Sequence, residues 1–417
     1  GVEWLGDIPA SWSLLANKHI FRLKKKQVGK RSSEYDLLSL TLRGVIKRDM
    51  ENPEGKFPAE FDTYQEVQCG DFIFCLFDVE ETPRTVGLSP FNGMITGAYT
   101  VFELNDNFDN RFLYYFYMNL DAKKMLKPLY RGLRNTIPKD SFLSFKTFVP
   151  PHEQQTRIAN FLDKKTALID EAISIKEQQI SLLKERKQII IQQAVTQGLD
   201  PNVPMKDSGV DWIGKIPAHW DIVPGFTVFK EGKDSNKGMI ESQVLSLSYG
   251  NVIIKPEEKL VGLVPESFET YQIALPGDII IRCTDLQNDK TSLRTGIVRN
   301  KGIITSAYLN LRLKTEHSAE FMHYFLHVLD ITKTIYRFGS GLRQNLSYKD
   351  FKHMRILMPP KAEQIEIVNY INNQVEVTES SIDLIKNKIE KLKEYKTTLI
   401  NSAVTGKIKI TPEMVEQ

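Results

Sequence analysis

The sequence predicts an α+β protein in which one plan occurs twice: two compact α/β domains, each followed by a long helix. Three observations predict it. A twelve-residue segment at 1–12 returns at 209–220, and short β-type runs fill 1–150 and 209–358. The end of each copy then carries apolar residues at alternating steps of three and four. Such steps are typical of helices that pack as a coiled coil.

The duplication covers nearly the whole chain. GVEWLGDIPASW at the start becomes GVDWIGKIPAHW at 209–220, with two Trp, two Gly and an Ile-Pro pair in register. Four further matches follow in the same order: Leu-Ser-Leu at 38 and 245, Ile-Thr-x-Ala-Tyr at 95 and 304, Gly-Leu-Arg at 132 and 341, and Ala-Val-Thr at 194 and 403. Repeats of this length define the fold, so both halves are expected to fold alike. Because residues 205–208 precede the second copy, we expect a few residues ahead of Gly1.

Each copy begins with a compact domain, at 1–150 and 209–358. Short β-type runs such as 71–77 and 277–282 are separated by Gly, Asn and Pro, which favour turns. One aromatic stretch interrupts them, at 110–120 and 319–329. Its aromatic residues follow helical spacing and are therefore predicted to lie in the core: Phe112, Tyr115, Phe116, Phe321, Tyr324 and Phe325.

Long helices are predicted over 151–197 and 359–405, each entered through a Pro-Pro pair. Gly198 and Gly406 end them, leaving a linker at 198–208 and a C-terminal tail at 406–417. Neither apolar stripe is stable alone in water, so we expect the helices to pair antiparallel, relating the copies by a pseudo-twofold axis. The predicted seam is Ile158, Leu162, Ile169, Ile173, Ile180, Leu183 and Ile190 with Ile367, Ile371, Ile382, Ile385, Ile389, Leu392 and Leu399.

Composition excludes several classes of protein. The net charge of +3 is small, so any DNA-binding face must come from how charge is distributed. Three cysteines (Cys69, Cys75 and Cys283) are too few and too scattered for a disulfide framework and are expected to be reduced. The most apolar stretch, at 112–120, is about half the length that a membrane span needs. We therefore expect a cytoplasmic protein with no membrane partner.

The sequence lacks the motifs that would predict a catalytic site. The sequence contains neither a Gly-x-x-x-x-Gly-Lys-Ser/Thr phosphate loop nor the Asn/Asp-Pro-Pro-Tyr/Phe motif of adenine methyltransferases. His323 and His327 stand at helical spacing, but among Phe321, Tyr324 and Phe325 we expect them in the core or at its rim rather than on a metal. No catalytic residue, metal site or cofactor is therefore expected on this chain.

Candidate DNA contacts come from cations and amides near glycine or in divergent loops. Arginine pairs with guanine and Asn or Gln with adenine, while Lys positions phosphates. The Gly-Leu-Arg loops have an alternative interpretation as structural turns, and the lysine run as a solvated face. The other cations lie where the two copies diverge or carry insertions. The candidates are Lys24, Lys25, Lys26, Arg43, Lys47, Arg48, Arg84, Arg134, Asn135, Arg282, Lys290, Arg294, Arg299, Arg343, Gln344 and Asn345.

Three motifs together carry a family resemblance. The Trp-Leu-Gly-x-Ile-Pro-x-x-Trp opening, the Pro-Pro-x-x-x-Gln-x-x-Ile helix entry at 150 and 359, and the Ala-Val-Thr helix end resemble the specificity subunits of Type I restriction–modification systems, bacterial or archaeal. The resemblance implies two target-recognition domains that each read half of a bipartite, asymmetric site in double-stranded DNA. It also implies helices that set the spacing and dock two methyltransferase subunits, with restriction–translocase subunits joining them.

The same resemblance implies a non-catalytic subunit. S-adenosylmethionine, ATP and Mg²⁺ are then expected on the partner subunits. One alternative is a structural coiled-coil adaptor whose globular ends bind protein. Another is a self-sufficient DNA methyltransferase or nuclease, which the missing motifs disfavour.

Overall fold

The computed structural model describes residues 8–50, 60–256, 258, 267–284, 293–314, 316–338 and 345–416. The chain divides into two compact units. Unit 1 consists of Gly1–Glu177 with Lys386–Gln417, and unit 2 of Gln178–Ile385. Lys290, Arg343 and Gln344, three of the candidate DNA contacts, lie outside the described residues.

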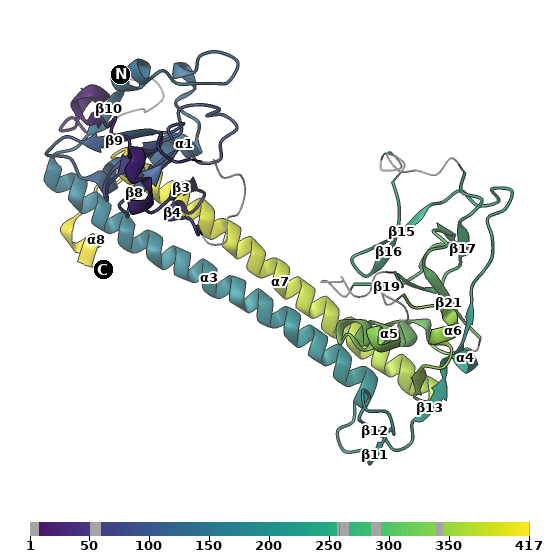
Figure 1. Cartoon of the computed structure of the whole chain (residues 1–417). Coiled ribbons are helices and arrows are strands. Elements are labelled where there is room, and N and C mark those ends of the chain that lie inside the picture. Colours follow the sequence, from purple (N-terminus) through teal and green to yellow (C-terminus); the bar gives the residue numbers. More distant parts are fainter. Residues whose placement is uncertain are drawn as a thin grey trace. The chain divides into compact units, whose positions relative to one another are not determined.

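Unit 1 is a mixed α+β domain (Figure 1). Its central sheet is antiparallel, with strands in the order β2–β9–β6–β7, and it is accompanied by the pairs β1–β10, β3–β4 and β5–β8. The strands are β1 (Ser13–Ala16), β2 (Phe21–Leu23), β3 (Leu38–Thr41), β4 (Gly44–Lys47), β5 (Gln65–Val67), β6 (Phe72–Phe74), β7 (Val86–Leu88), β8 (Gly93–Ile95), β9 (Thr100–Leu104) and β10 (Lys146–Val149). Two helices, α1 (Asn110–Ala122) and α2 (Lys139–Ser144), precede β10.

Unit 2 repeats this topology. Its sheet runs β14–β21–β18–β19, with the pairs β13–β22, β15–β16 and β17–β20, and β11–β12 as an addition. The strands are β11 (Met205–Asp207), β12 (Lys215–Pro217), β13 (Asp221–Pro224), β14 (Phe229–Glu231), β15 (Leu245–Ser248), β16 (Asn251–Ile254), β17 (Gln272–Ala274), β18 (Ile279–Ile281), β19 (Thr295–Ile297), β20 (Gly302–Ile304), β21 (Leu309–Leu313) and β22 (Arg355–Met358). The helices are α4 (Gly225–Val228), α5 (Ala319–Ile331) and α6 (Tyr348–Phe351). The α+β class is confirmed.

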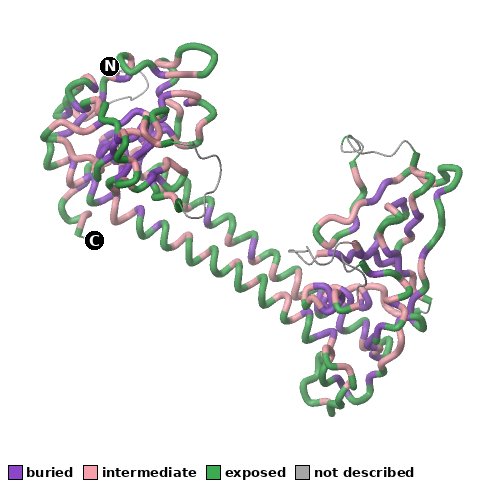
Figure 2. The backbone as a smooth tube through the Cα atoms, viewed as in Figure 1, coloured by how far each residue is buried: buried purple, intermediate pink, exposed green. Residues whose placement is uncertain are grey.

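The core of each unit forms around its aromatic helix, as the spacing predicts. Phe112, Tyr115 and Phe116 of α1 are buried against the sheet, and Phe321 and Phe325 of α5 are buried in unit 2. Tyr324 is only partly buried. Figure 2 shows the buried segments concentrated in the sheets and in these helices. Both helices begin at a side-chain cap, Asp109 or Ser318, which accepts hydrogen bonds from the first free backbone N–H groups.

Two long helices, α3 (His152–Gln197) and α7 (Lys361–Val404), contribute to both units. Within unit 1, Asp170 of α3 pairs with Lys396 of α7 at 2.7 Å, and Ile158 and Leu162 share a core with Ala403. The helices therefore run antiparallel there, because higher positions on α3 meet lower positions on α7.

The same direction holds in unit 2. Lys187 pairs with Glu379, and Ala194 shares a core with Ile367 and Ile371. Every predicted seam residue is buried or half-buried. The pseudo-twofold relation stays a prediction. No helix among the described residues is long and apolar enough to cross a membrane.

A buried glutamine ties each long helix to its aromatic helix. Gln155, 2% exposed, donates from Nε2 to the Pro150 carbonyl at 2.9 Å and accepts from the backbone N–H of Asp109 at 2.9 Å. Gln364, fully buried, repeats both bonds with Pro359 and with the N-cap Ser318. One amide side chain supplies the donor that a buried carbonyl needs and the acceptor that a partly buried N–H needs. This explains the Pro-Pro-x-x-x-Gln motif.

The opening motif of each copy packs on the end of the other copy's long helix. In unit 1, Gly406 after α7 has φ +71°, and a Cβ there would lie 2.5 Å from Pro9 and 3.3 Å from Trp12. In unit 2, Gly198 after α3 has φ +76°, and a Cβ there would lie 3.3 Å from Trp220. Glycine is therefore required twice over at each helix end, for the left-handed backbone and for the close approach.

His323 and His327 lie on α5 at the rim of the unit 2 core. Burial, with smaller contributions from the nearby His327 and Arg299, lowers the pKa of His323 to about 4. Burial also lowers the pKa of His327, with Lys187 adding to the effect. Both histidines are consequently neutral at pH 7, and no group of three or more metal-binding side chains occurs among the described residues. The equivalent residues of α1 are Tyr114 and Met118.

Replacing the glutamine should destabilise its unit. Gln155→Ala or Gln364→Ala leaves a buried C=O and a partly buried N–H without partners, and the unpaired carbonyl alone costs about 1–3 kcal/mol. We expect the free energy of unfolding in denaturant, followed by circular dichroism, to fall by that order. Gln178→Ala on the exposed surface of α3 is the matched control and should change little. Equal losses in the variants and the control would contradict the role of the glutamine.

Unit 2 should lose stability in mild acid. A histidine whose pKa is lowered by folding binds fewer protons than in the unfolded chain, so stability is complete above pH 6.5 and is lost as the pH falls toward 4. Replacing the pair as His323→Tyr with His327→Met, the residues that α1 carries, should remove on the order of 2 kcal/mol of this loss. Denaturant unfolding between pH 7 and pH 4.5 measures it. An unchanged pH dependence would exclude the two histidines as its source.

Candidate nucleic-acid interface

The lysine run of unit 1 is divided between the interior and the surface. Lys24 is only 11% exposed and pairs at 2.7 Å with Asp71, a buried carboxylate ahead of β6. Lys26 pairs at 2.8 Å with Glu66, and its hydrogen bond lowers the pKa of that carboxyl group. Lys25 is exposed and has no ion pair among the described residues. The expectation that all three lysines contact phosphate is therefore wrong for Lys24, because a buried aspartate requires its charge.

The Gly-Leu-Arg loop of unit 1 is anchored. Arg134 holds Asp78 with two hydrogen bonds, from Nε at 3.2 Å and from Nη2 at 2.9 Å. Asn135 adopts a left-handed backbone with φ +44° and donates to Glu81. Arg134 stays at the surface, and its Nη1 has no partner in the described part of the chain. The loop is a structural turn whose arginine still offers donors; its DNA contact stays a prediction.

Four further cations of unit 1 lie on or near the hairpin β3–β4. Arg43 is exposed at the hairpin tip, and its guanidinium pairs with no described residue. Lys47 pairs with Asp36 at 2.6 Å. Arg48 is half-buried, and Arg84 donates to the Tyr114 hydroxyl at 3.1 Å. Of these four cations, Arg43 is therefore the one best able to bind a new partner.

In unit 2 the candidate arginines are placed differently. Arg294 is 6% exposed, and its Nη1 donates to the carbonyls of Arg282 and Thr284 at 3.3 and 2.6 Å. It therefore supports a strand end from inside the domain, which corrects the expectation of a DNA contact. Arg282 is exposed. Arg299 is exposed and pairs with Glu320 at 3.3 Å. Asn345, the described end of the second Gly-Leu-Arg loop, is exposed.

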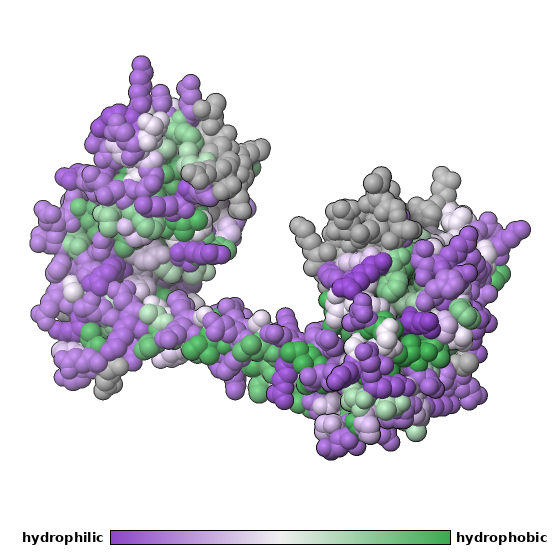
Figure 3. Space-filling view, turned by 60° about the horizontal axis from the view of Figure 1, so that its bottom comes forward, coloured by the Kyte–Doolittle hydropathy of each residue, from purple (hydrophilic) through white to green (hydrophobic). Residues whose placement is uncertain are grey.

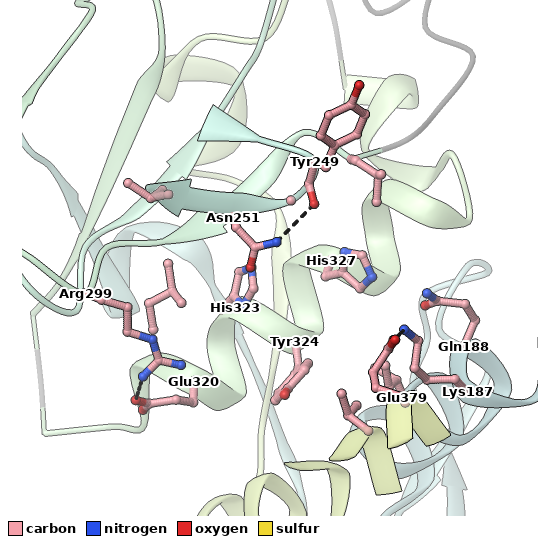
Figure 4. A pocket seen from close by; sticks show the side chains of 16 residues that line it. Lys187, Gln188, Tyr249, Asn251, Arg299, Glu320, His323, Tyr324, His327 and Glu379 are labelled. Carbon is pink, nitrogen blue, oxygen red and sulfur yellow. Dashed lines mark hydrogen bonds and ion pairs between the residues drawn. The ribbon is translucent and has the colours of Figure 1, made fainter. Parts of the chain in front are cut away.

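A pocket of about 380 Å³ lies in unit 2 among the β15–β16 tip, α5 and the long helices (Figure 4). Its wall carries two ion pairs, Arg299 with Glu320 and Lys187 with Glu379. Unit 1 has a hollow at the equivalent place, where Arg111 pairs with Asp163 at 2.8 Å. These ion pairs neutralise most of the charge on both walls, and the neutral histidines add none.

The long helices expose apolar side chains at every seventh position. On α3 these are Leu168, Ile175, Leu182 and Ile189, and on α7 they are Tyr370, Val377 and Leu384. Figure 3 shows apolar side chains gathered along the helices. A seven-residue interval keeps side chains on one face of a helix, so each helix has a stripe beyond the buried seam. We call these two sets the exposed stripes.

Apart from Arg43, the sequence interpretation missed the residues at the hairpin tips. Leu42 and Tyr249 are the most exposed large apolar residues of the two hairpins, at 65% and 82%. A signal was present: Leu-Ser-Leu repeats at 38 and 245, but Leu-Arg-Gly at 42–44 becomes Tyr-Gly-Asn at 249–251. Abrupt divergence inside a repeated segment marks the point where the two copies differ in surface chemistry.

Comparisons with known proteins agree with this architecture. Residues 86–185, from β7 into α3, match the family model for the Type I restriction modification DNA specificity domain. A solved structure from work on complex assembly and conformational transition of the type I R-M system shares the fold, with a TM-score of 0.69 and 14% identity over 96% of this chain and 100% of that one. The HsdS subunit from Thermoanaerobacter tengcongensis gives a TM-score of 0.55 and 15% identity over 96% of this chain and 98% of that one.

At such identities the two structures show likeness of fold, while the family model identifies the segment that it covers. Residues 86–185 are therefore similar to the Type I restriction modification DNA specificity domain, in agreement with the resemblance to Type I specificity subunits that the motifs indicated.

Proposed function

We propose that this chain is the DNA-specificity subunit of a Type I restriction–modification enzyme and is not itself catalytic. The observation that carries the proposal is the duplication: the strand order of unit 1, which holds most of the matched segment, returns in unit 2. Two copies of one reading domain suit a bipartite site, since each domain reads one half. Their different surfaces make the two half-sites different, so the site is asymmetric.

The long helices are proposed to set the separation of the half-sites. An α-helix rises about 1.5 Å per residue, so the 46 residues of α3 extend about 70 Å. Dimeric DNA readers place their half-sites one helical turn, or a multiple of it, apart because their domains are held at a fixed distance. A paired helix is a stiff spacer of that kind.

The exposed stripes are proposed to dock two methyltransferase subunits, with restriction–translocase subunits joining through them. Apolar residues repeated every seven positions on a solvated helix are what a partner helix needs for packing. The fold is shared with a structure from work on assembly of the type I R-M system, which supports this proposal. S-adenosylmethionine, ATP and Mg²⁺ are assigned to those partner subunits, and none to this chain.

The proposal is tested by sequencing methylated DNA from cells that express this chain with its methyltransferase subunit. We expect a split adenine motif that disappears when the chain is omitted. Exchanging residues 13–149 for the equivalent domain of another family member should change one half of the motif and leave the other half intact. Absence of any motif in the presence of the methyltransferase would favour the protein-binding adaptor, and methylation by the isolated chain would show an enzyme.

A charge in an exposed stripe should weaken docking without unfolding the chain. Leu182→Asp or Val377→Asp changes a side chain that is exposed in this chain, so the melting temperature should change little. Burying an unpaired carboxylate against a partner is costly, and we expect the affinity for the methyltransferase to fall at least about tenfold, or about 1.4 kcal/mol. Ser181→Asp, an exposed position outside the stripe, is the matched control. Undiminished affinity in titration calorimetry would place the docking surface elsewhere.

A further inference from the structure

We infer that the two-stranded ribbons β3–β4 and β15–β16 enter the major groove of DNA, and that their tips, residues 42–44 and 249–251, discriminate between bases. The inference rests on the proposed function and deepens it, because it names the elements that read the sequence. It comes from the geometry of the ribbons, the side chains on their outer faces and the difference between their tips.

Each ribbon is a separate two-stranded sheet with one face fixed to its domain. Across β3–β4, Leu40 lies opposite Val45 on the inner face. A Cβ on Gly87 would lie 2.6 Å from Leu40 and 2.8 Å from Val45, so strand β7 supports the ribbon at the closest possible approach. In unit 2, Gly296 supports Leu247 and Val252 in the same way, at 2.6 and 3.0 Å. Strands β7 and β19 therefore support the inner faces of the two ribbons.

The outer faces of the two ribbons carry similar side chains. Opposite residues of an antiparallel pair share a face, so Ser39 with Ile46, and Ser246 with Ile253, point away from the domain. Ile46 and Ile253 are both exposed. Neither range, 38–48 or 245–255, contains an acidic residue; the first includes three cations and the second includes one, Lys255. Small hydroxyls, a branched apolar side chain and positive charge suit phosphates and thymine methyl groups.

The dimensions also fit. The major groove of B-DNA admits a two-stranded β-ribbon, and each base pair presents a distinct pattern of donors, acceptors and methyl groups there. A ribbon seated by its inner face presents its outer face and its tip to the groove. The ribbons themselves carry no acidic side chain, and Asp36, which contacts the first ribbon, is paired with Lys47, so this surface favours DNA over a protein partner.

The tips of the two ribbons differ in sequence, although strands β7 and β19 support both ribbons in the same way. In unit 2, Tyr249 and Gly250 both have left-handed backbones, with φ +47° and +79°. That conformation is unfavourable for a tyrosine, and strain of this kind gathers at functional sites. Its ring nevertheless projects away from the pocket residues, while Asn251 Nδ2 donates to the Tyr249 carbonyl at 3.2 Å (Figure 4). The turn therefore holds an aromatic ring outward.

In unit 1 the tip is built differently. Gly44 has φ +98°, and the Thr41 hydroxyl accepts from the Arg43 N–H at 3.1 Å and donates to the Gly44 carbonyl at 3.0 Å. Leu42 and Arg43 project from this turn. A guanidinium without a described partner is suited to the bidentate pairing with guanine, while an aromatic ring and an amide suit thymine and adenine. One scaffold with two tips is what an asymmetric site requires.

The experiment uses the full chain assembled with its methyltransferase subunits and a library of randomised duplexes, read out by methylation. Arg43→Ala removes a side chain with no described partner, so folding should be unaffected. We expect discrimination at one position of one half-site to fall about ten- to one-hundredfold, the range for a bidentate contact. Exchanging residues 42–44 for Tyr-Gly-Asn should change bases in that half-site and leave the other half-site and the spacer unchanged. Lys139→Ala, exposed on α2, is the control.

The outcomes separate the two proposals. A wild-type assembly with no split motif overturns the proposed function. A wild-type split motif that neither the tip exchange nor Arg43→Ala alters overturns the ribbon inference alone. An unaltered motif combined with weaker binding of the methyltransferase would show that the ribbons dock protein, which also overturns it.

Discussion

A buried amide holds each globular domain to its long helix. Gln155 and Gln364 lie where the chain leaves the domain through two prolines, so the backbone there lacks the N–H groups that usually make such a connection rigid. The amide replaces them by bonding to a proline carbonyl on one side and to a helix N-cap on the other. Because the proline carbonyl is buried, breaking its bond to the amide is costly. The direction in which each helix leaves its domain therefore depends on two hydrogen bonds.

Residues distant in sequence complete each unit. Trp12 packs beside Gly406 and Trp220 beside Gly198, so the end of each long helix belongs to the domain that the other copy begins. In unit 1 the tail continues past Gly406, and Lys164 of α3 donates to the carbonyls of Val415 and Glu416. Neither globular domain is thus a contiguous piece of chain in its packing. Each one needs the helix that enters its core from the far half of the sequence.

Periodic features were visible in the sequence, and pairings between distant residues were not. The seam and the aromatic core follow from spacing alone, because helix geometry converts an interval into a face. Lys24 and Arg294 could not be placed in the same way, since nothing near them in the sequence indicates the buried Asp71 or the carbonyls of Arg282 and Thr284. A charged residue predicts a DNA contact only when its ion pairs and hydrogen bonds within the protein are known. The tips at 42–44 and 249–251 could have been predicted from the sequence if divergence between the copies had been given more weight than charge.

The glycines that support the ribbons limit which amino-acid substitutions such a protein tolerates. At Gly87 and Gly296 a single added carbon collides with the leucine and valine of the ribbon, so these positions tolerate almost no variation. At Leu42 and Tyr249 the side chains are 65% and 82% exposed, so most substitutions should leave the fold as it was. The same ribbons therefore combine tips that tolerate substitution with supporting glycines that do not. A lineage carrying this scaffold can drift from one surface chemistry to another by point mutation, without passing through an unfolded ancestor.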